Sequence, residues 1–436
     1  MAHDPARTAV LALGLRTPQT KAGGAFAKEN AAHLGATVAR EVLARSGVAV
    51  GDVEEVIVGC VGPPHDQANV ARVLALRAGV PKEIPAFTVA RNCASGMEAL
   101  SQAVLRIEAG VGSCYLAVGV EVMSQYPLIV GQEMTAFFDR LSRARGAGAK
   151  LATFASFRPR FLAPRIALLE GLTDPTCGLI MGKTAEILGR EFAISRRDSD
   201  EYALRSHQLA AKARDAGRFA REILPLLPLG AKDGASSLEH DDGIRDTQTM
   251  EALAKLKPYF EKPDGIVTVG NSCGITDGAT ALLVTSEARA KSLGLTPLAR
   301  IRAVTFAGLD PSRMGLGPVY SSAKALQRVG ATLADVGPIE INEAFAVQVL
   351  ACAKAFASKQ FAERELGLGA ALGELDFART NANGGAIALG HPVGASGARI
   401  VLTAAHELAS SDRPFALATL CIGGGQGGAT VLEKLA

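Results

Sequence analysis

Residues 88–100 read Thr88-Val-Ala-Arg-Asn-Cys-Ala-Ser-Gly-Met-Glu-Ala-Leu100, an apolar strand-like run that turns directly into a helix-like run. Cys93 falls at this junction, so we expect it at the N-terminus of a helix. Unpaired N–H groups and the helix dipole at such a site favour a thiolate, which is the nucleophilic form of cysteine. The sequence therefore suggests a catalytic nucleophile at Cys93, with a buried structural cysteine as the alternative.

Composition narrows the class of protein. With 436 residues, 48% of them hydrophobic, the chain is long enough for two or three domains with ample core. A formal net charge of +3 gives no reason to expect nucleic acid as the main partner. The seven cysteines are odd in number and scattered, and they form no Cys-x-x-Cys pair, which favours a reducing compartment and disfavours a structural zinc site. Neither a signal peptide nor a membrane span is apparent, so we expect a cytoplasmic protein.

On both sides of Cys93, strand-like and helix-like runs alternate. This alternation predicts an α/β fold with parallel strand pairs and helices on both faces of the sheet. The expected strands are 8–14, 53–61, 87–90, 114–120, 280–285, 299–307, 339–342, 415–422 and 429–433, and the expected helices are 31–45, 70–77, 94–107, 199–217, 319–330 and 398–408, with another starting at 344.

Two features suggest a duplicated unit with an insertion. The run Thr276-Asp-Gly-Ala-Thr-Ala-Leu-Leu-Val resembles Gln426-Gly-Gly-Ala-Thr-Val-Leu, as if two halves of the chain ended alike. We therefore predict two similar halves, each with a five-stranded mixed sheet. Residues 124–262 are polar, basic and poor in strand signals, and we interpret them as a lid inserted in the first half.

Three further loops have the composition of a functional site. Asn342 follows a short strand in Glu340-Ile-Asn-Glu-Ala-Phe-Ala, His391 lies in the glycine-rich run that begins at Asn383, and Cys421 ends an apolar strand. Ligands of open α/β sheets bind beyond the carboxyl ends of strands, so we expect these residues to meet Cys93 at one rim. Taken singly, they are also compatible with a helix cap, a turn histidine and a core cysteine.

These loops resemble the four site loops of the thiolase family. The matching runs are Asn92-Cys-Ala-Ser-Gly, Asn342-Glu-Ala-Phe, Gly390-His-Pro-Val-Gly-Ala-Ser-Gly and Cys421-Ile-Gly-Gly-Gly, together with Arg16-Thr-Pro, Met181-Gly-Lys-Thr-Ala-Glu and Gly270-Asn-Ser-Cys-Gly-Ile-Thr-Asp-Gly-Ala. Longer runs resemble the thiolase (β) subunit of the fatty-acid oxidation trifunctional complex: Phe161-Leu-Ala-Pro, Asp200-Glu-Tyr-Ala-Leu-Arg-Ser-His and Leu253-Ala-Lys-Leu-Lys-Pro. That subunit has His-Glu-Ala-Phe where this chain has the common thiolase form with Asn342.

The resemblance implies a thiolase-like α/β fold. Two similar βαβαβαββ halves would form a layered α-β-α-β-α core with an inserted lid domain. The expected domains are an N-terminal half at 1–123, completed by 263–290, a lid at 124–262 and a C-terminal half at 291–436.

The resemblance also implies a 3-ketoacyl-CoA thiolase of fatty-acid β-oxidation that works by a ping-pong mechanism. Cys93 would attack the ketone and become acylated, and His391 would take its proton. Cys421 would protonate the leaving acetyl-CoA carbanion. Asn342, through a water, and His391 would stabilise the enolate, while the backbone N–H groups of Cys93 and Gly423 would form a second oxyanion hole.

Coenzyme A would be a co-substrate, with no permanently bound cofactor and no metal. By resemblance, Arg245 would lie near the adenine, and Ser272 and Gly274 would line the pantetheine tunnel. Met181 and Phe345 would wall the acyl site, although ordinary core packing explains them equally well.

Three other activities are compatible with parts of the pattern. A biosynthetic acetoacetyl-CoA thiolase would share every catalytic residue, whereas a ketoacyl synthase would have a histidine or asparagine in place of Cys421. A third possibility is a scaffold subunit that anchors a complex to a membrane, but the intact catalytic residues argue against a purely structural role. The expected partners are a second copy in a homodimer or tetramer and an enoyl-CoA hydratase/3-hydroxyacyl-CoA dehydrogenase subunit.

Residues 137–165 carry seven basic residues against one acid, Asp139, a local charge of +6, with phenylalanine and leucine interleaved. Glycine and proline interrupt the segment, so at most two short helices are expected. It could pack on the protein as a lid that binds CoA phosphates. It could also dock a dehydrogenase subunit or an anionic membrane, which would make the protein peripheral to the membrane.

Overall fold

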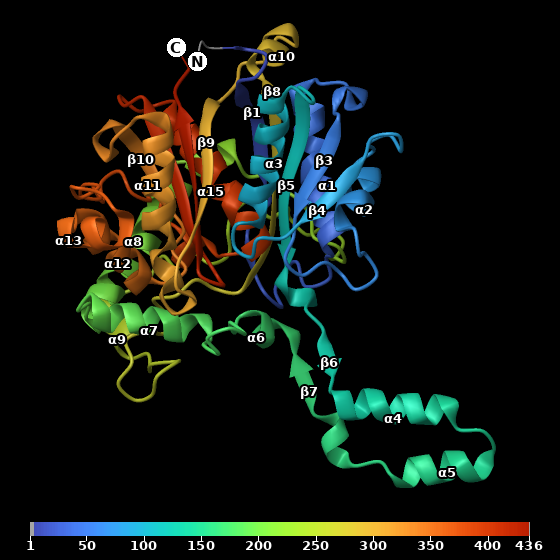
Figure 1. Cartoon of the computed structure of the whole chain (residues 1–436). Helices are drawn as coiled ribbons and strands as arrows, with labels where there is room; N and C mark the ends of the chain where they lie inside the picture. The colour runs from blue at the N-terminus through green and yellow to red at the C-terminus, as the bar shows by residue number, and fades with distance from the viewer. Residues whose placement is uncertain (1–3, 436) are drawn as a thin grey trace.

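A ten-stranded mixed sheet forms the body of the molecule in the computed structural model, which describes residues 4–435 (Figure 1). Part of the expectation about the N-terminus concerns residues 1–3, which lie outside the described residues. The strands of the sheet are β1 (Ala9–Arg16), β2 (Thr20–Lys21), β3 (Glu55–Gly59), β4 (Ala86–Val89), β5 (Cys114–Val122), β8 (Thr276–Ser286), β9 (Ala299–Gly308), β10 (Val336–Ile341), β11 (Phe415–Ile422) and β12 (Gln426–Glu433). Their order is β10-β11-β12-β9-β1-β8-β5-β3-β4, with β2 paired to β8.

The two halves of the sheet repeat one topology. In the first half, β3 pairs in parallel with β5, β5 pairs antiparallel with β8, and β8 pairs antiparallel with β1. In the second half, β10, β11, β12 and β9 repeat the same sequence of pairings. The halves join where β1 meets β9 through only two register pairs. The predicted duplication is therefore confirmed, and the two similar runs at Thr276 and Gln426 are the equivalent strands β8 and β12.

Five strands were predicted in each half: the first half contains the five predicted strands and also the two-residue β2, whereas the described residues of the second half form four strands instead of five. The position beside β10 is occupied by a single parallel bridge between Ile339 and Thr380. Residues 376–380 form a turn instead of a strand, because the backbone N–H groups of Arg379 and Thr380 donate to the carbonyl of Asp376. The Asp376 side chain closes the same turn by accepting from the N–H of Ala378.

Helices cover the sheet in layers. Helices α1 (Ala31–Ser46) and α2 (Val70–Arg77) lie on the outer face of the first half, and α11 (Gly317–Val329), with α12 (Ala346–Ala357) beside it, on that of the second. Helices α3 (Ser95–Ala109) and α15 (Val393–Leu408) pack between the halves (Figure 1). These two approach closely, since a Cβ on Gly96 would lie 2.9 Å from the carbonyl oxygen of Gly394. The result is the expected α-β-α-β-α order.

The lid segment lies across the lower end of the body in Figure 1. Its helices are α6 (Ala167–Gly171), α7 (Met181–Glu191), α8 (Arg196–Asp215) and α9 (Met250–Ala254); the remaining helices are α10 (Glu287–Ser292), α13 (Lys359–Phe361) and α14 (Ala386–Leu389). Arg16, at the end of β1, is completely buried and holds the lid to the first half. Its guanidinium donates to Asp241 at 2.7 and 2.9 Å and to Glu222 at 2.7 Å.

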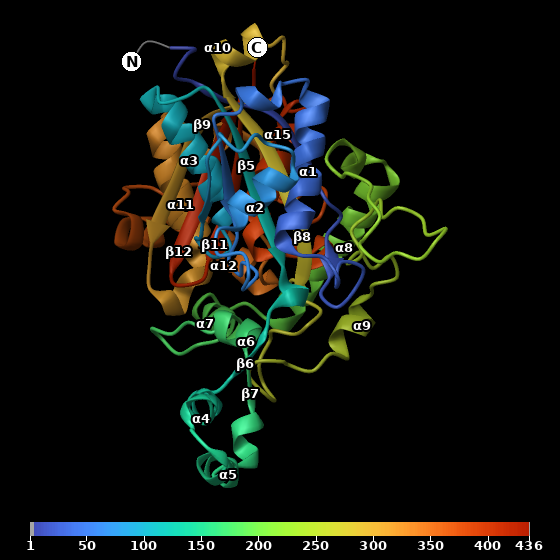
Figure 2. The same cartoon turned by 90° about the vertical axis from the view of Figure 1, so that its right-hand side faces the viewer.

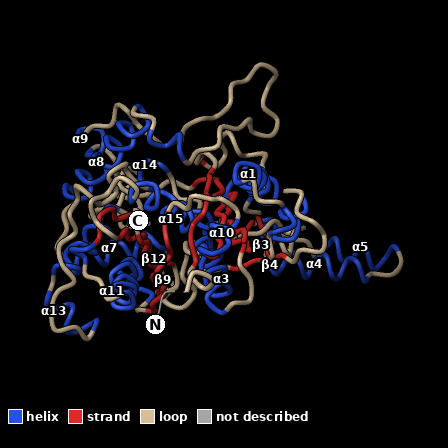
Figure 3. Tube along the Cα trace, turned by 90° about the horizontal axis from the view of Figure 1, so that it is seen from above, coloured by secondary structure: helices blue, strands red, loops and turns tan. Residues whose placement is uncertain are grey.

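Residues 128–166, which we call the arm, stand away from the body (Figures 1 and 2). A ribbon of β6 (Leu128–Val130) and β7 (Pro164–Ile166) carries the helices α4 (Gln132–Arg143) and α5 (Ala147–Ala155). The view from above places the arm at one side of the strands (Figure 3). Inside it, Phe137 is only 3% exposed and packs against Phe138, Phe154, Phe157 and Phe161. The two short helices expected here are present, and of the two alternatives left open by the sequence, packing on the body is not the one found.

Candidate active site

The predicted site loops follow the carboxyl ends of strands, where α/β sheets place their ligands. Cys93 comes shortly after β4, Asn342 directly after β10, and Gly423 directly after β11, while His391 precedes α15. Two neighbouring cavities lie there. A chamber of about 120 Å³, which we call the Cys93 chamber, is lined by Cys93 and Gly423. A larger cavity of about 350 Å³, which we call the tunnel, is lined by His391.

Cys93 stands on a tight turn between β4 and α3. The preceding Asn92 has a φ of 43°, in the left-handed region that asparagine tolerates better than most residues. Its side-chain amide donates to the carbonyl of Gly423 at 2.7 Å. This hydrogen bond joins the loop that bears Cys93 to the glycine-rich loop after β11. Ser95 closes the turn, because its hydroxyl donates to the carbonyl of Asn92 at 2.8 Å and accepts from the N–H of Arg91 at 2.9 Å.

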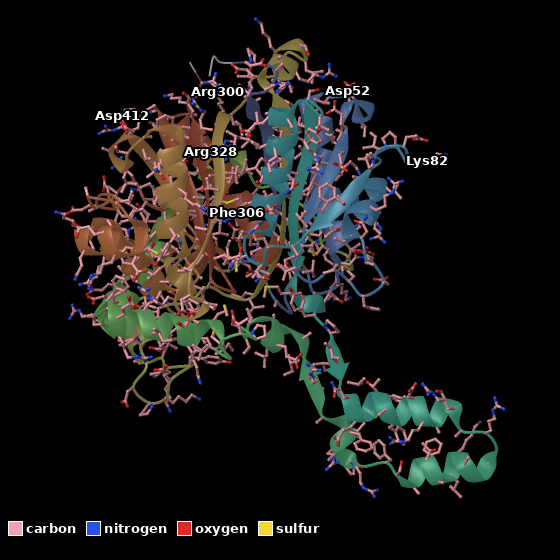
Figure 4. All side chains as sticks on the ribbon, in the orientation of Figure 1. Asp52, Lys82, Arg300, Phe306, Arg328 and Asp412 are labelled. Carbon is pink, nitrogen blue, oxygen red and sulfur yellow. The ribbon has the colours of Figure 1, made fainter. Side chains whose placement is uncertain are left out.

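The same turn is held from outside by Arg91. Its guanidinium donates to Glu98 at 2.7 Å and lies over the ring of Phe306, 4.1 Å from the ring centre. Figure 4 marks Phe306 on β9 near the middle of the body, so the turn that carries Cys93 is fixed to the second half of the molecule. The position of Cys93, the predicted nucleophile, thus depends on contacts from both halves.

The resting state of Cys93 differs from the expectation. Burial is the main influence and raises the pKa of the thiol, while the backbone N–H groups of Gly423 and of Cys93 itself contact the sulfur and oppose that rise. The prediction of a thiolate stabilised by the helix N-terminus is therefore wrong for the resting site, because desolvation outweighs the donors. The two N–H groups nevertheless converge at the reacting sulfur, where they can stabilise an anion that forms during a reaction.

His391 is buried and hydrogen-bonded through both ring nitrogens. Its Nδ1 lies 2.6 Å from the hydroxyl of Ser396, and that hydroxyl donates its own proton to the carbonyl of Pro392 at 3.1 Å. Ser396 is therefore the acceptor, which places the ring proton on Nδ1 and leaves Nε2 as the basic nitrogen. Burial and the charge of Arg399 lower the pKa of His391 to about 3, so the imidazole is neutral at physiological pH.

Asn342 pairs with that basic nitrogen. Its Nδ2 lies 3.4 Å from Nε2 of His391, and its backbone N–H donates to the carbonyl of Thr419 at 3.0 Å. The side chain is fully buried, and its Oδ1 accepts no hydrogen bond from any described residue. A buried amide oxygen without a donor is costly, so this site is suited to a ligand or water that supplies one.

Cys421 lies on β11 and is 1% exposed. Burial raises the pKa of its thiol well above the ordinary value, and the nearby thiols of Cys93, Cys352 and Cys273 raise it further. The electrostatic interaction with Cys93 shows that the two predicted catalytic cysteines are neighbours. A neutral, buried thiol beside the nucleophile can act as a proton donor and, once deprotonated, as a proton acceptor.

The residues predicted to contact substrate divide between the two cavities. Met181 lines both cavities, whereas Ser272, Gly274 and Phe345 line only the tunnel. Ser272 and Phe345 face each other in an isolated antiparallel bridge. Arg245 belongs to neither cavity: it is exposed on the lid, where its backbone N–H donates to His207 at 3.3 Å. Of the ten predicted site residues, only Arg245 is not brought to this rim.

Sequence reasoning missed three residues that support the site. Ser396 orients His391 and was visible only as one of several residues in the same glycine-rich loop. Glu121 is a single acid within the apolar strand β5, an anomaly that could have been noticed. Glu343 is buried and accepts from Tyr202 at 2.9 Å, and it was interpreted only as a possible cap.

Glu343 joins the lid to the loop that bears Asn342. It also accepts from the hydroxyl of Ser206 at 2.7 Å, from Asn381 at 2.9 Å and from the N–H of Ile387 at 3.1 Å. Tyr202 and Ser206 both belong to α8, so this carboxylate fixes a lid helix next to the catalytic loop.

Comparisons with known proteins agree with this geometry. The family model "Thiolase, N-terminal domain" matches residues 9–288, and "Thiolase, C-terminal domain" matches residues 295–434. The chain is 41% identical to the 3-oxoadipyl-CoA/3-oxo-5,6-dehydrosuberyl-CoA thiolase of Escherichia coli (strain K12), over 98% of this chain and 100% of the relative. It is 42% identical to the 3-ketoacyl-CoA thiolase of Vibrio cholerae, over 98% of this chain and 99% of the relative.

Solved structures give the same answer. The acetyl-CoA acetyltransferase of Bacillus anthracis superimposes with a TM-score of 0.85 at 37% identity, covering 98% of this chain and 99% of that one. Human mitochondrial 3-ketoacyl-CoA thiolase in complex with CoA superimposes with a TM-score of 0.83 at 36% identity, covering 99% and 98%. Fold, site geometry and these matches together show that the chain belongs to the thiolase family and is an acyltransferase.

Proposed function

We propose that this enzyme cleaves 3-ketoacyl-CoA with CoA, giving acetyl-CoA and a shortened acyl-CoA through an acyl-Cys93 intermediate in fatty-acid β-oxidation. One observation carries the proposal. The Cys93 sulfur receives two backbone N–H groups, and it lies close to the Cys421 thiol. The tunnel beside it holds the basic Nε2 of His391, paired with Asn342. A nucleophile, a base, a second acid and two sets of donors are what this reaction requires.

In the first half-reaction, Cys93 Sγ attacks the ketone carbon and its proton passes to His391 Nε2. The N–H groups of Cys93 and Gly423 stabilise the oxyanion. The bond between the ketone carbon and the α-carbon then breaks, and its electron pair forms the acetyl-CoA enolate. His391 and Asn342 donate to the enolate oxygen, and Cys421 protonates the carbon.

In the second half-reaction, a CoA thiol replaces acetyl-CoA. Its proton passes to the Cys421 thiolate left by the first half-reaction, and its sulfur attacks the acyl-Cys93 thioester. The Cys93–acyl bond breaks and the Cys93 sulfur takes back its proton from His391, which restores both groups and gives ping-pong turnover. Coenzyme A acts as a co-substrate in this scheme, and no permanently bound cofactor takes part in any step.

The Cys93 chamber favours a hydrocarbon acyl chain. Among the described residues that line it, none is Lys, Arg or His, while Met123, Leu168 and Leu172 are apolar. Asp174 also lines it, and hydrogen bonds from Thr176 lower the pKa of its carboxyl, so this group is an anion. A chain that ends in a carboxylate would be repelled there, so we propose 3-ketoacyl chains and not the oxoadipyl class named for the Escherichia coli relative.

The biosynthetic direction is the alternative, since a thiolase that condenses two acetyl-CoA molecules would use the same residues. The Bacillus anthracis structure, an acetyl-CoA acetyltransferase by its title, makes this a real competitor. The two activities differ in substrate range: a biosynthetic enzyme would be confined to the acetoacetyl group, whereas the proposed enzyme would also cleave longer 3-ketoacyl chains.

We also propose a cytoplasmic homo-oligomer, a dimer or tetramer, that contacts an anionic membrane through its arm. All seven cysteines are free, which suits a reducing compartment. No helix among residues 4–435 is long and apolar enough to cross a membrane. On the arm, Leu128, Leu151 and Leu162 are 63–72% exposed beside basic side chains. A hydratase/dehydrogenase subunit is the other candidate occupant of that surface.

The test of the catalytic proposal separates the two cysteines. After incubation with labelled acetyl-CoA, we expect mass spectrometry to find the acetyl group on the Cys93 peptide of the wild type. Cys93→Ala should carry no label and cleave no 3-ketoacyl-CoA. Cys421→Ala should still be acetylated, because thioester exchange at Cys93 needs no carbon acid, yet it should lose carbon–carbon cleavage. His391→Asn should acylate about two to four orders of magnitude more slowly. Label on Cys421 in place of Cys93 would reverse the assignment.

A further inference from the structure

The Cys93 chamber shares a wall with a third cavity that the proposed reaction does not use. This cavity, of about 260 Å³, lies beside the first and is lined largely by Pro63, Pro64, Pro127 and other apolar residues. Both cavities are lined by Val61, Tyr126 and Gly171. Gly171 has no side chain, so the partition between the two spaces consists mainly of Tyr126 and Val61.

Tyr126 is fixed in the partition by two independent contacts. Its hydroxyl donates to Oε1 of Glu121 at 3.0 Å, and burial raises its pKa, so it remains a protonated donor. Its ring lies directly on Gly62, where an added Cβ would come within 2.4 Å of the ring. A ring held by its hydroxyl and packed on Gly62 cannot swing aside for a longer ligand without losing both contacts.

Glu121 in turn is anchored more firmly than the tyrosine. It is completely buried and accepts from the N–H groups of Val61 and Gly62 at 2.9 Å each, and from that of Gly394 at 3.1 Å. These donors come from the loop after β3 and from the start of α15. Tyr126 lies at the start of the lid segment, but through Glu121 the partition is tied to the loop after β3 and to α15, which belong to the body of the molecule.

The size of the chamber makes this wall a limit on chain length. About 120 Å³ lies on the Cys93 side, below the ~300 Å³ at which ligand sites usually begin, and more than twice that volume lies beyond the tyrosine. The tunnel is the larger neighbour on the other side, and residues predicted to contact pantetheine line it. If pantetheine occupies the tunnel, the Cys93 chamber is the space that remains for an acyl chain attached to Cys93.

We propose that Tyr126 determines acyl chain length by closing the Cys93 chamber, so that the enzyme prefers short 3-ketoacyl chains and the cavity behind Tyr126 stays empty of substrate. This inference rests on the proposed function, because it assumes that an acyl chain is carried by Cys93. Each methylene that finds no room forfeits about 0.8 kcal/mol of burial, or about fourfold in kcat/KM.

The experiment compares kcat/KM for thiolysis of 3-ketobutyryl-, 3-ketohexanoyl- and 3-ketodecanoyl-CoA. We expect the wild type to be at least about tenfold poorer with the decanoyl than with the hexanoyl substrate, since several methylenes are excluded. Tyr126→Ala joins the two cavities and should raise the decanoyl-to-hexanoyl ratio by about tenfold or more. Tyr126→Phe keeps the ring and loses only the hydroxyl, so its ratio should equal that of the wild type.

A second variant opens the same wall without disturbing Glu121. Val61→Ala removes two methyl groups from the partition and should shift the ratio in the same direction, by a smaller factor, even if Tyr126→Ala does not fold. The ratio is measured within one preparation, so partial inactivation cancels. A wild type that cleaves decanoyl as well as hexanoyl chains, or opened variants with an unchanged ratio, would overturn the inference. Absence of thiolysis by the wild type on all three substrates would instead overturn the proposed function.

Discussion

The two side chains that we propose as nucleophile and base, Cys93 and His391, are both neutral at rest. Burial raises the pKa of the Cys93 thiol and lowers that of His391 to about 3, so no thiolate–imidazolium pair is present before substrate binds. Proton transfer must therefore accompany attack on the carbonyl, when the N–H groups of Cys93 and Gly423 meet an oxyanion. A site of this kind is protected from stray alkylation, because very little of the reactive anion is present at neutral pH before substrate binds.

This state predicts an unusual pH dependence for alkylation of Cys93. Because the pKa of the thiol lies above its ordinary value of 9.0, less than about 1% is thiolate at pH 7, and the anion grows about tenfold per pH unit. We expect the rate constant for iodoacetamide at the Cys93 peptide to rise throughout pH 7–9 without a plateau. The Cys93→Ala variant is the control, because it should lose the alkylation that is assigned to Cys93. A plateau below pH 8 would mean that the protein stabilises the Cys93 thiolate.

At the scale of elements, the arm is the part of the molecule whose structure is least explained by catalysis. Its ribbon and two helices place Phe138, Leu151 and Phe154 at 50–72% exposure. Three basic residues, Arg143, Arg160 and Arg165, form ion pairs with acids. Arg140, Arg145 and Lys150 are exposed and form no ion pair with any residue in 4–435. Apolar side chains beside unpaired cations suit an anionic lipid surface.

The arm hypothesis is tested by co-sedimentation with vesicles of phosphatidylserine and phosphatidylcholine. Each cation near such a surface contributes about 1 kcal/mol, so changing Arg140, Arg145 and Lys150 together to Ser should weaken binding by about 100-fold at low salt. High salt should weaken binding of the wild type as well.

The matched control changes three exposed lysines outside the arm, Lys82, Lys232 and Lys291, to Ser, and it should bind like the wild type. Figure 4 shows Lys82 on the body, far from the arm. If the wild type does not co-sediment with anionic vesicles at low salt, the membrane hypothesis fails. Capture of a hydratase/dehydrogenase subunit that requires the arm would then assign the surface to a protein partner.

On the scale of the whole molecule, one buried cluster joins the lid to the sheet. The Arg16 guanidinium, 0% exposed, binds two carboxylates that come from far along the chain. The domain division at 1–123 with 263–290, 124–262 and 291–436 remains our proposal. On that division, this cluster is a seam between the N-terminal half and the lid.

Replacing Arg16 should destabilise the protein strongly. Arg16→Leu leaves Glu222 and Asp241 buried without a counter-charge, and removal of one partner from a buried pair typically costs about 3–5 kcal/mol. We expect that loss in the free energy of urea unfolding at pH 7. Arg197→Leu is the control: its side chain is 82% exposed and pairs with Glu201, so it should cost at most about 0.5 kcal/mol.

The same variant has a predicted pH signature. In the wild type, Arg16 helps to keep the pKa of Glu222 below its usual value, so this carboxylate stabilises the fold above its unfolded pKa of about 4.3 and ceases to do so as the pH falls. In Arg16→Leu the same carboxylate is destabilising until it is protonated. The difference in unfolding free energy should therefore narrow as the pH falls, beginning above about pH 4.3, where Glu222 of the variant takes up its proton, and continuing below it; a constant difference would show that Arg16 acts by packing alone.

The local sequence pattern determined most of the elements and all four site loops. The alternation of apolar runs and helical periods placed β1, β5, β9 and β11 within a few residues, because these patterns depend on near neighbours along the chain. Cys93, Asn342, His391 and Cys421 were singled out from their loops, since strand ends and glycine-rich turns are local features too, whereas the role of Gly423 came only from the resemblance to thiolases. The repeated ending at β8 and β12 likewise gave the duplication.

Only the tertiary structure decided how these elements act on one another. The state of Cys93 depends on how much protein surrounds it, and the basic nitrogen of His391 depends on the hydroxyl of Ser396 in the next helix. Tyr126 is held between the two cavities only by its hydrogen bond to Glu121 and its packing on Gly62. The arm shows the same limit: its sequence is compatible with packing on the body or standing away from it. Burial, hydrogen-bond direction and packing depend on residues that are distant in the chain and meet only in the fold. A local sequence pattern therefore does not reveal them.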